Sequence, residues 1–309
     1  MDILACTDKN YIMPCGVMMR SLCENNINEH IVFHLIVDEN VDKRCKNKLQ
    51  QCLVGDSTIH FYHFDNSILK KYAIDQGHHL TIAAYYRLFI CDILPQNINR
   101  IIYLDCDLIV RHSLKKLWNT NLTNKALGAV TDMGEALPER YSRLNYPPSL
   151  GYFNSGVLLI NLAYWREHKL QDVFWKYMEE NIRKLKQHDQ DVLNYICRNS
   201  KVNLPFIYNS QDGFGYNKVF FDVKKYAREL PDALTAPVIL HFTANKPWEK
   251  ECDHPYKSEF FKYQKLTPWK EMPLVSAKIP LTRKQKLVRF LRMIGLIKPR
   301  YKILTKELM

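Results

Sequence analysis

Two carboxylates stand one residue apart at the end of an apolar run. The run reads I-I-Y-L-D-C-D-L over residues 101–108, and its acids are Asp105 and Asp107. Side chains alternate across a strand, so residues at i and i+2 project from the same face, and these carboxylates are predicted to lie side by side. Like charges that close repel each other. The pair therefore predicts a bound cation, a shared proton, or a phosphate chemistry in which one acid attacks.

A divalent cation is one partner for such a pair, because carboxylates are hard oxygen ligands that suit Mg²⁺ or Mn²⁺. A candidate third ligand is His241, which lies in a short predicted strand over residues 237–242. An imidazole among carboxylates favours Mn²⁺. The alternatives are a structural role for the histidine and a solvated surface position for the acid pair.

Common phosphate-binding loops are missing from the chain. It contains no G-x-x-x-x-G-K-[ST] and no G-x-G-x-x-G after a first strand, and the esterase pattern G-x-S-x-G is also absent. A divalent ion on the acid pair could hold a phosphate instead.

Strand and helix patterns alternate along the first third of the chain. Strands are predicted at 2–7, 31–37, 58–64 and 101–105, and helices at 14–25, 41–53 and 82–91. This alternation predicts an α/β fold with a mostly parallel sheet flanked by helices. Ligands bind outside the carboxyl ends of strands in such sheets, which is where Asp8, Asp105 and Asp107 fall.

The pattern continues less regularly towards the C-terminus. Further strands are predicted at 126–132 and 153–162, a long helix at 163–185, and a second helix at 188–196 that begins with an acidic cap.

Length and composition favour one large domain. The 309 residues are 47% hydrophobic, and no apolar run is long enough to cross a membrane. The first residues lack the basic start of a secretory signal. The nine cysteines form no C-x-x-C pair, which argues against a disulfide framework or a zinc site and favours a reduced cytoplasm.

The basic charge is concentrated in a C-terminal tail. Of the net charge of +12, most belongs to residues 278–309, which contain ten Lys or Arg and one acid, Glu307. We therefore predict a globular domain over 1–277 with no nucleic-acid partner, followed by a tail over 278–309. Residues 281–298 have the pattern of a basic amphipathic helix, which favours contact with an anionic membrane surface. The alternative is a solvated helix packed on the domain.

Several motifs together resemble glycosyltransferase family 8, in particular the bacterial lipopolysaccharide α-galactosyl and α-glucosyl transferases. They occur in family order over about residues 1–250: M-D-I-L-A-C-T-D-K-N-Y at the start, A-Y-Y-R-L at 84–88, I-Y-L-D-C-D-L-I-V at 102–110, Y-F-N-S-G-V-L-L-I-N-L at 152–162, H-D-Q-D-V-L-N at 188–194 and H-F-T-A-N-K-P-W at 241–248.

This resemblance implies a GT-A fold, a UDP-sugar donor and a Mn²⁺ ion, with Mg²⁺ as a possible substitute. The implied metal ligands are Asp105, Asp107 and His241. The implied nucleotide-binding residues are Cys6, Thr7, Asp8, Asn10, Tyr11, Asp105, Cys106 and Lys246, of which Lys246 meets the diphosphate. The implied donor-sugar residues are Arg87, Asn154, Ser155, Asp189 and Gln190, of which Asp189 and Gln190 are the candidate catalytic residues.

Family 8 enzymes retain the anomeric configuration, and the resemblance places Gln190 near the anomeric carbon. An amide is a poor nucleophile, so we favour front-face displacement, in which the departing phosphate oxygen helps to deprotonate the acceptor hydroxyl. A covalent route through Gln190 or Asp189 stays open.

The sequence thus predicts a cytoplasmic, peripherally membrane-bound enzyme that transfers galactose or glucose from a UDP-sugar to lipopolysaccharide or another surface glycan. One alternative is a haloacid-dehalogenase-type phosphatase with Asp105 as nucleophile. Another is a non-catalytic protein that binds membranes or polyanions through its tail. Deleting residues 280–309 is expected to leave donor turnover intact in an enzyme and to abolish membrane association.

Overall fold

The fold is built on a seven-stranded sheet. The structure, a computed structural model, describes residues 1–64, 82–277 and 281–301. The strand order is β3-β2-β1-β4-β7-β6-β8. The strands are β1 (Asp2–Thr7), β2 (Ile31–Val37), β3 (Ser57–His63), β4 (Arg100–Leu104), β6 (Leu127–Thr131), β7 (Phe153–Asn161) and β8 (Lys201–Asn203).

One strand runs against the others. The pairs β3–β2, β2–β1, β1–β4 and β6–β8 are parallel, whereas β7 is antiparallel to both β4 and β6. The beginning of β7 therefore lies at the edge where its neighbours end. The predicted mostly parallel sheet is confirmed.

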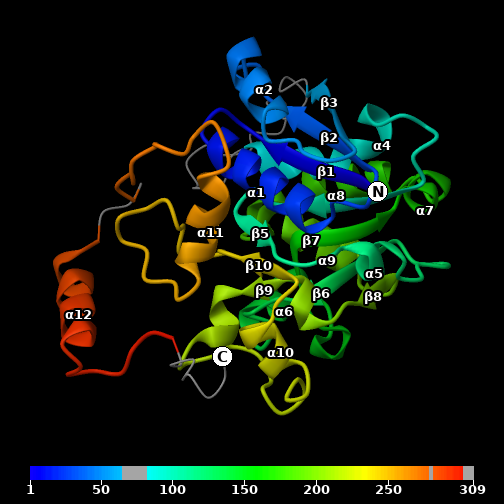
Figure 1. Cartoon of the computed structure of the whole chain (residues 1–309). Helices are drawn as coiled ribbons and strands as arrows, with labels where there is room; N and C mark the ends of the chain where they lie inside the picture. The colour runs from blue at the N-terminus through cyan, green and yellow to red at the C-terminus, as the bar shows by residue number, and fades with distance from the viewer. Residues whose placement is uncertain (65–81, 278–280, 302–309) are drawn as a thin grey trace.

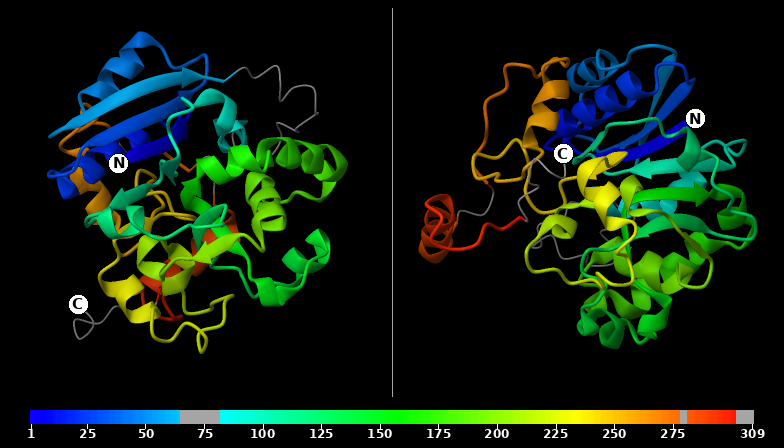
Figure 2. Two further views of the ribbon diagram at one scale, coloured as in Figure 1. Left: turned by 90° about the vertical axis from the view of Figure 1, so that its right-hand side faces the viewer. Right: turned by 60° about the horizontal axis from the view of Figure 1, so that its bottom comes forward.

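Alternating side chains place two apolar layers on the two faces of the sheet. In β1, Ile3 and Ala5 belong to one core cluster, and Leu4 and Cys6 belong to the other. The first cluster packs against α1 (Ile12–Asn25), and the second against α7 (Leu162–Glu167), α8 (Leu170–Asn181) and α9 (His188–Cys197). Figure 1 and Figure 2 show helices on both sides of the sheet. Burial on both faces explains why the central strands β1, β2, β4, β6 and β7 read as nearly continuous apolar runs.

A second, three-stranded sheet adjoins the first. Its order is β5 (Leu108–Val110), β10 (Ile239–His241) and β9 (Ser210–Gln211), with β10 antiparallel to β5 and parallel to β9. The strand predicted at 237–242 is thus confirmed as β10, but it belongs to this second sheet. Its partner β5 directly follows Asp107 in the sequence. This pairing brings His241 beside Leu108.

Apart from α12, the remaining α-helices in the described part of the chain are short. They are α2 (Lys43–Gln50), α4 (Ile90–Ile93), α5 (Lys115–Trp118), α6 (Pro138–Leu144), α10 (Leu230–Thr235) and α11 (Lys257–Gln264).

Two predicted helices differ from the structure. The helix expected over 163–185 is divided into α7 and α8, because Lys169 adopts a left-handed conformation with φ of 48° that cannot continue a right-handed helix. The helix expected over 82–91 is mainly a 3₁₀ helix, η1 (Ile82–Phe89), followed by α4. Side chains from Tyr85 to Phe89 are all buried, so packing on several sides replaces the one-sided pattern of an amphipathic helix.

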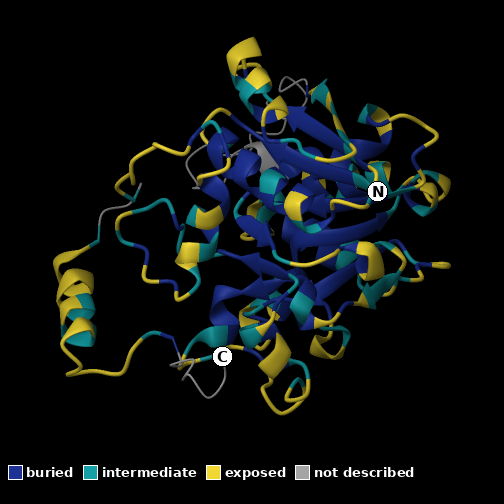
Figure 3. Cartoon of the chain, viewed as in Figure 1, coloured by how far each residue is buried: buried dark blue, intermediate teal, exposed yellow. Residues whose placement is uncertain are grey.

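The tail forms a helix at the edge of the molecule. Helix α12 (Arg283–Met293) begins with a capping box between Thr282 and Gln285, and the chain then returns to the domain at Tyr301 (Figure 1). Figure 3 shows that most of α12 is exposed. Among the described residues, no helix combines the length and the apolarity needed to span a bilayer. The predicted domain boundary at 278 and the last tail residues, 302–309, lie outside the described residues.

Candidate functional site

A cleft of about 1120 Å³ opens at the edge of the main sheet. Every predicted site residue lines it: Cys6, Thr7, Asp8, Asn10, Tyr11, Arg87, Asp105, Cys106, Asp107, Asn154, Ser155, Asp189, Gln190, His241 and Lys246. The direction of the strands explains why these residues lie together, because β1 and β4 end at this edge and the antiparallel strand β7 begins there. The roles of these residues stay predictions, whereas their proximity is a structural fact.

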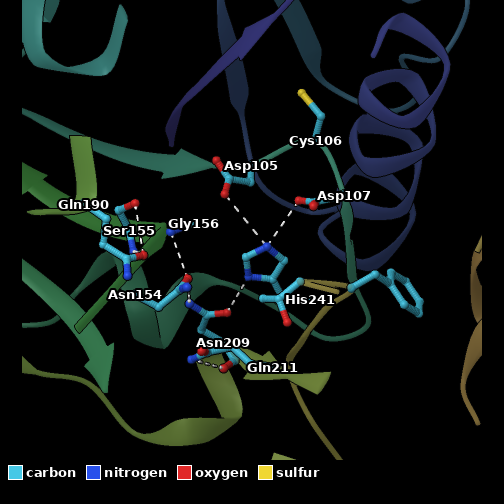
Figure 4. A network of polar contacts seen from close by, with 12 residues as sticks. Asp105, Cys106, Asp107, Asn154, Ser155, Gly156, Gln190, Asn209, Gln211 and His241 are labelled. Atoms are coloured by element: carbon cyan, nitrogen blue, oxygen red, sulfur yellow. Dashed lines mark hydrogen bonds and ion pairs between the residues drawn. The ribbon is translucent and has the colours of Figure 1, made fainter. Parts of the chain in front are cut away.

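Asp105, Asp107 and His241 form a candidate metal site. Their ligand atoms all lie within 4.8 Å of one another. The Nε2 atom of His241 lies 3.8 Å from Oδ2 of Asp105 and 3.2 Å from Oδ1 of Asp107 (Figure 4). Cys106, between the two acids, instead directs its thiol to the carbonyl of Cys6 at 3.4 Å. The predicted juxtaposition of the two carboxylates is therefore present, although both lie just beyond the end of β4.

A buried amide orients the imidazole of His241. Its Nδ1 lies 2.8 Å from Oδ1 of Asn209, whose amide nitrogen donates to Oδ1 of Asn154 at 2.9 Å. Nδ1 therefore carries the proton, and the lone pair of Nε2 faces the carboxylates. Metal-binding histidines are typically fixed in this way by a second hydrogen bond. The two carboxylates and the imidazole thus fit a divalent cation.

Gly156 leaves room for this group. A β-carbon at this position would lie 2.2 Å from Cε1 of His241 and 2.7 Å from Oδ2 of Asp105. The glycine also accepts a hydrogen bond at its carbonyl from the Asp105 backbone N–H, at 2.8 Å. The backbone of β7 therefore touches the candidate metal site directly.

Lys246 forms an ion pair with Asp107 and also donates to the carbonyl of Phe242 at 2.7 Å. Burial alone would raise the pKa of Asp107, but the positive charge of Lys246 outweighs burial and lowers it. Burial would likewise lower the pKa of Lys246, and Asp107 raises it instead. Both groups are therefore charged at neutral pH.

Arg87 joins Asp105 of the candidate metal site to a second acid, Asp189. Its guanidinium lies 2.9 Å from Oδ1 of Asp105 and 3.1 Å from Oδ2 of Asp189, and it stacks 4.0 Å above the ring of Tyr103. Burial raises the pKa of Asp189 to about 6, an effect that Arg87 opposes and Asp105 reinforces. Asp189 accepts a further hydrogen bond from the hydroxyl of Ser155 at 3.2 Å. A carboxylate with this pKa can change protonation near neutral pH.

Gln190 is held at both ends of its amide. The oxygen accepts from the backbone N–H of Ser155 at 3.0 Å, and the nitrogen donates to Oδ2 of Asp132 at 3.2 Å. Asn154 donates to the same Asp132 oxygen at 3.1 Å. Helix α9, which carries Gln190, begins here as predicted, but its N-cap is Gln187, without a capping side chain.

Asp132 and Asn209 were missed by the sequence analysis. Asp132 is buried, pairs with Arg140 at 2.5 Å and connects the amides of Asn154 and Gln190. It directly follows β6, so the rule that selected acids at strand ends could have found it. Asn209 had no comparable signal, because it lies in an irregular segment just before the short strand β9.

The predicted nucleotide-binding residues lie around the beginning of α1. Oδ1 of Asp8 accepts from the backbone N–H groups of Asn10 and Tyr11, at 2.8 and 3.0 Å, and so fixes this turn. Tyr11 packs edge-on against Trp248, with ring centroids 5.9 Å apart. Burial raises the pKa of Tyr11 to about 12, so its hydroxyl is protonated beside Lys246. Aromatic rings at this end of the cleft can stack on a base.

The chain matches a known protein family over most of its length. The pattern of the family described as Glycosyl transferase family 8 matches residues 2–252, which include the whole cluster from Cys6 to Lys246. The chain belongs to glycosyltransferase family 8. This membership favours glycosyl transfer over the phosphatase and the non-catalytic alternatives.

Two relatives are similar to this chain over most of its length. It is 30% identical over 274 residues to General stress protein A of Bacillus subtilis (strain 168), a match that covers 87% of this chain and 94% of that protein. It is also 30% identical over 278 residues to a lipopolysaccharide 1,2-glucosyltransferase of Escherichia coli, covering 87% of this chain and 79% of the relative.

A solved structure confirms the GT-A fold. The galactosyltransferase LgtC, solved in complex with donor and acceptor sugar analogs, superposes with a TM-score of 0.78 at 24% identity. The match covers 87% of this chain and 96% of LgtC. The predicted family 8 membership and the GT-A fold are thus both confirmed.

Proposed function

We propose that the protein is a retaining hexosyltransferase that moves galactose or glucose from a UDP-sugar to a surface glycan such as lipopolysaccharide. The observation that carries this proposal is the cluster of Asp105, Asp107, His241 and Lys246 in the cleft of a family 8 chain. Breaking the sugar–phosphate bond leaves negative charge on the diphosphate, so stabilising that charge is the central task.

Asp105, Asp107 and His241 would hold a divalent cation, and the mixed oxygen and nitrogen ligands favour Mn²⁺ over Mg²⁺. The cation supplies positive charge to the leaving diphosphate. Lys246 adds a second positive charge from the other side of Asp107.

Arg87, Asn154, Ser155 and Asp189 are proposed to hold the donor sugar. Asp189 can accept a hydrogen bond from a sugar hydroxyl when it is ionised, and Arg87 keeps its carboxylate in place. Cys6, Thr7, Asp8, Asn10, Tyr11 and Cys106 are proposed to surround the nucleotide. Cys6 and Cys106 are buried thiols that contribute shape and backbone groups. Burial raises the pKa of Cys6, and a hydrogen bond with Cys15 together with burial raises that of Cys106, so neither thiol ionises at neutral pH.

Front-face displacement is the mechanism that the site favours. Gln190 is the residue proposed to lie near the anomeric carbon, and its amide is already engaged with Ser155 and Asp132. In this mechanism the bond from the anomeric carbon to the phosphate oxygen breaks, and a bond to the acceptor oxygen forms on the same face. The acceptor proton passes to the departing phosphate oxygen. A covalent route through Gln190 or Asp189 would instead require a glycosyl bond to one of these side chains.

The acceptor is inferred from the relatives and from the tail. One relative is named for lipopolysaccharide, a membrane glycolipid. Helix α12 exposes Leu287, Phe290 and Met293 next to several Lys and Arg residues, as expected for a helix on an anionic membrane. We therefore propose that the enzyme works in the cytoplasm on the inner face of the cell membrane, with residues 278–309 as a membrane-associating tail after the catalytic domain 1–277.

UDP release from a panel of UDP-sugars, with and without Mn²⁺, tests the proposal. Metal-dependent release from one donor, lost in Asp105→Ala but kept in Asp172→Ala, is the expected result. Asp172 is a matched control because it is an exposed acid on α8. Absence of release from every donor, together with hydrolysis of a phosphomonoester, would contradict the proposal and favour the phosphatase alternative.

A further inference from the structure

The chain returns from α12 to the domain through two residues that contact the loop beside the candidate active site. Arg300 donates to Oδ1 of Asn245 at 2.9 Å and to the hydroxyl of Tyr216 at 2.7 Å. The hydroxyl of Tyr301 accepts from the amide of Asn245 at 2.7 Å. Tyr301 is buried and pairs with Tyr216 in a β-bridge.

Asn245 is therefore fixed by the tail at both ends of its side chain. A third partner, Asp212, is 1% exposed, and its Oδ2 accepts from the Asn245 backbone N–H at 2.9 Å and from the Tyr301 hydroxyl at 3.3 Å. The Tyr301 hydroxyl can thus accept from Asn245 and donate to Asp212 at once. Buried polar groups connected in this way hold one geometry, because losing any member leaves the others unsatisfied.

The residue after Asn245 is Lys246, which pairs with Asp107. The path from the tail to the candidate metal site therefore has few steps: Tyr301 and Arg300 hold Asn245, its neighbour Lys246 holds Asp107, and Asp107 lies against His241. The backbone of Asn245 and the side chain of Lys246 are both anchored, so the loop between His241 and Trp248 is positioned from two directions.

We propose that Arg300 and Tyr301 form a clasp that positions Lys246 for the diphosphate of the donor. The inference rests on the proposed function, since it gives the C-terminal segment a part in binding UDP. Both clasp residues are positioning residues, because they act through Asn245 and Lys246. Removing residues 280–309 should consequently impair the donor site as well as membrane association, contrary to what the sequence alone led us to expect.

The binding of UDP and of uridine to the full chain, measured by calorimetry in the presence of Mn²⁺, tests the clasp. Tyr301→Phe keeps the ring and removes the hydroxyl with its hydrogen bonds to Asn245 and Asp212. We expect UDP binding to weaken at least about five-fold, the factor for a single hydrogen bond, with unchanged uridine binding. Tyr256→Phe is the matched control, because that hydroxyl donates to the carbonyl of Leu234, away from the loop. Arg300→Ala should resemble Tyr301→Phe, and Arg300→Lys should recover part of the affinity.

A double-mutant cycle separates positioning from general stability. If Tyr301 acts through Lys246, adding Tyr301→Phe to Lys246→Ala should weaken UDP binding no further. A chain that ends at residue 298 should lose UDP affinity while α12 still binds vesicles. UDP binding in Tyr301→Phe equal to that of Tyr256→Phe, or fully additive losses with Lys246→Ala, would overturn the clasp. Failure of the wild-type chain to bind UDP would instead contradict the proposed function.

Discussion

Gly156 lies so close to His241 that any β-carbon on the glycine would collide with the imidazole. The separation would be 2.2 Å from Cε1, well inside van der Waals contact. Its own φ is not in the left-handed region, so the glycine is needed for space and not for backbone conformation. The strand β7 thus contributes to the candidate metal site by the absence of a side chain.

We expect Gly156→Ala to reduce donor turnover on the order of 10²-fold, because the imidazole must shift to make room. Folding should be retained, as judged by circular dichroism and the melting temperature. Gly128→Ala in β6 is a suitable control, since a β-carbon there would meet the side chain of Leu204, at 3.2 Å, outside the cleft. Turnover in Gly156→Ala equal to that of the control would show that His241 does not need its present position.

Asn209→Ala is expected to weaken metal affinity by about 10- to 100-fold, because the proton on Nδ1 of His241 loses its acceptor. The Mn²⁺ concentration that gives half-maximal activity measures this effect. At saturating Mn²⁺, much of the activity should return, since the metal ligands themselves are unchanged. An unaltered Mn²⁺ requirement would mean that the amide does not orient the imidazole.

Asp189 should give the enzyme a pH dependence near pH 6. Burial raises its pKa to about 6, against the opposing charge of Arg87 and with the support of Asp105. Donor binding that uses the ionised carboxylate should therefore strengthen from pH 5 to pH 7, and Asp189→Asn should flatten this part of the kcat/KM profile. A profile with the same rise in Asp189→Asn would assign the titration to another group.

The raised pKa of Asp189 also determines whether its contribution to the free energy of unfolding rises or falls with pH. Folded Asp189 keeps its proton up to about pH 6, whereas the unfolded chain releases it near 3.8. The folded state binds more protons between these values, so the contribution of Asp189 to the free energy of unfolding falls as pH rises from about 4 to 6. Urea unfolding in EDTA at both ends of this range, for wild type and Asp189→Asn, measures the difference. Equal pH dependence in the two proteins would contradict it.

Helix α12 is expected to bind vesicles that contain phosphatidylglycerol and to leave phosphatidylcholine vesicles free. Leu287 and Phe290 are 57% and 51% exposed, and nearby basic residues each add about 1 kcal/mol at an anionic surface. Leu287→Glu with Phe290→Glu should reduce sedimentation with vesicles at least tenfold. Val173→Glu with Val223→Glu, at positions 40% and 36% exposed outside α12, controls for two added charges. Equal sedimentation of both variants would place the membrane contact elsewhere.

The sheet could be predicted well because burial on both faces leaves a strong apolar signal. The strands β1 and β2 have the bounds expected from the sequence. The break between α7 and α8 could not be predicted, because it depends on the left-handed conformation of Lys169, a residue that carries no turn signal of its own. The strand β5 was missed because its three residues directly follow the acid pair.

The candidate site was predicted where a motif or a strand end marks a residue. Residues that only position another residue carry a weaker signal in the sequence. Asn209 orients His241 from a loop, and Tyr301 reaches Asn245 from a distance of 56 positions in the sequence. Such contacts depend on how separate segments pack, which neither composition nor periodicity records.

The separation of the site residues along the chain also matters for protein synthesis. Asp107 and His241 are 134 positions apart, and the clasp residues Arg300 and Tyr301 follow His241 by a further 59 and 60 positions. On the ribosome, the first strands can pair long before the histidine has left the exit tunnel. A newly made chain therefore acquires its complete site only after Tyr301 has been added, and a product terminated before His241 has the strands of the main sheet without a working centre.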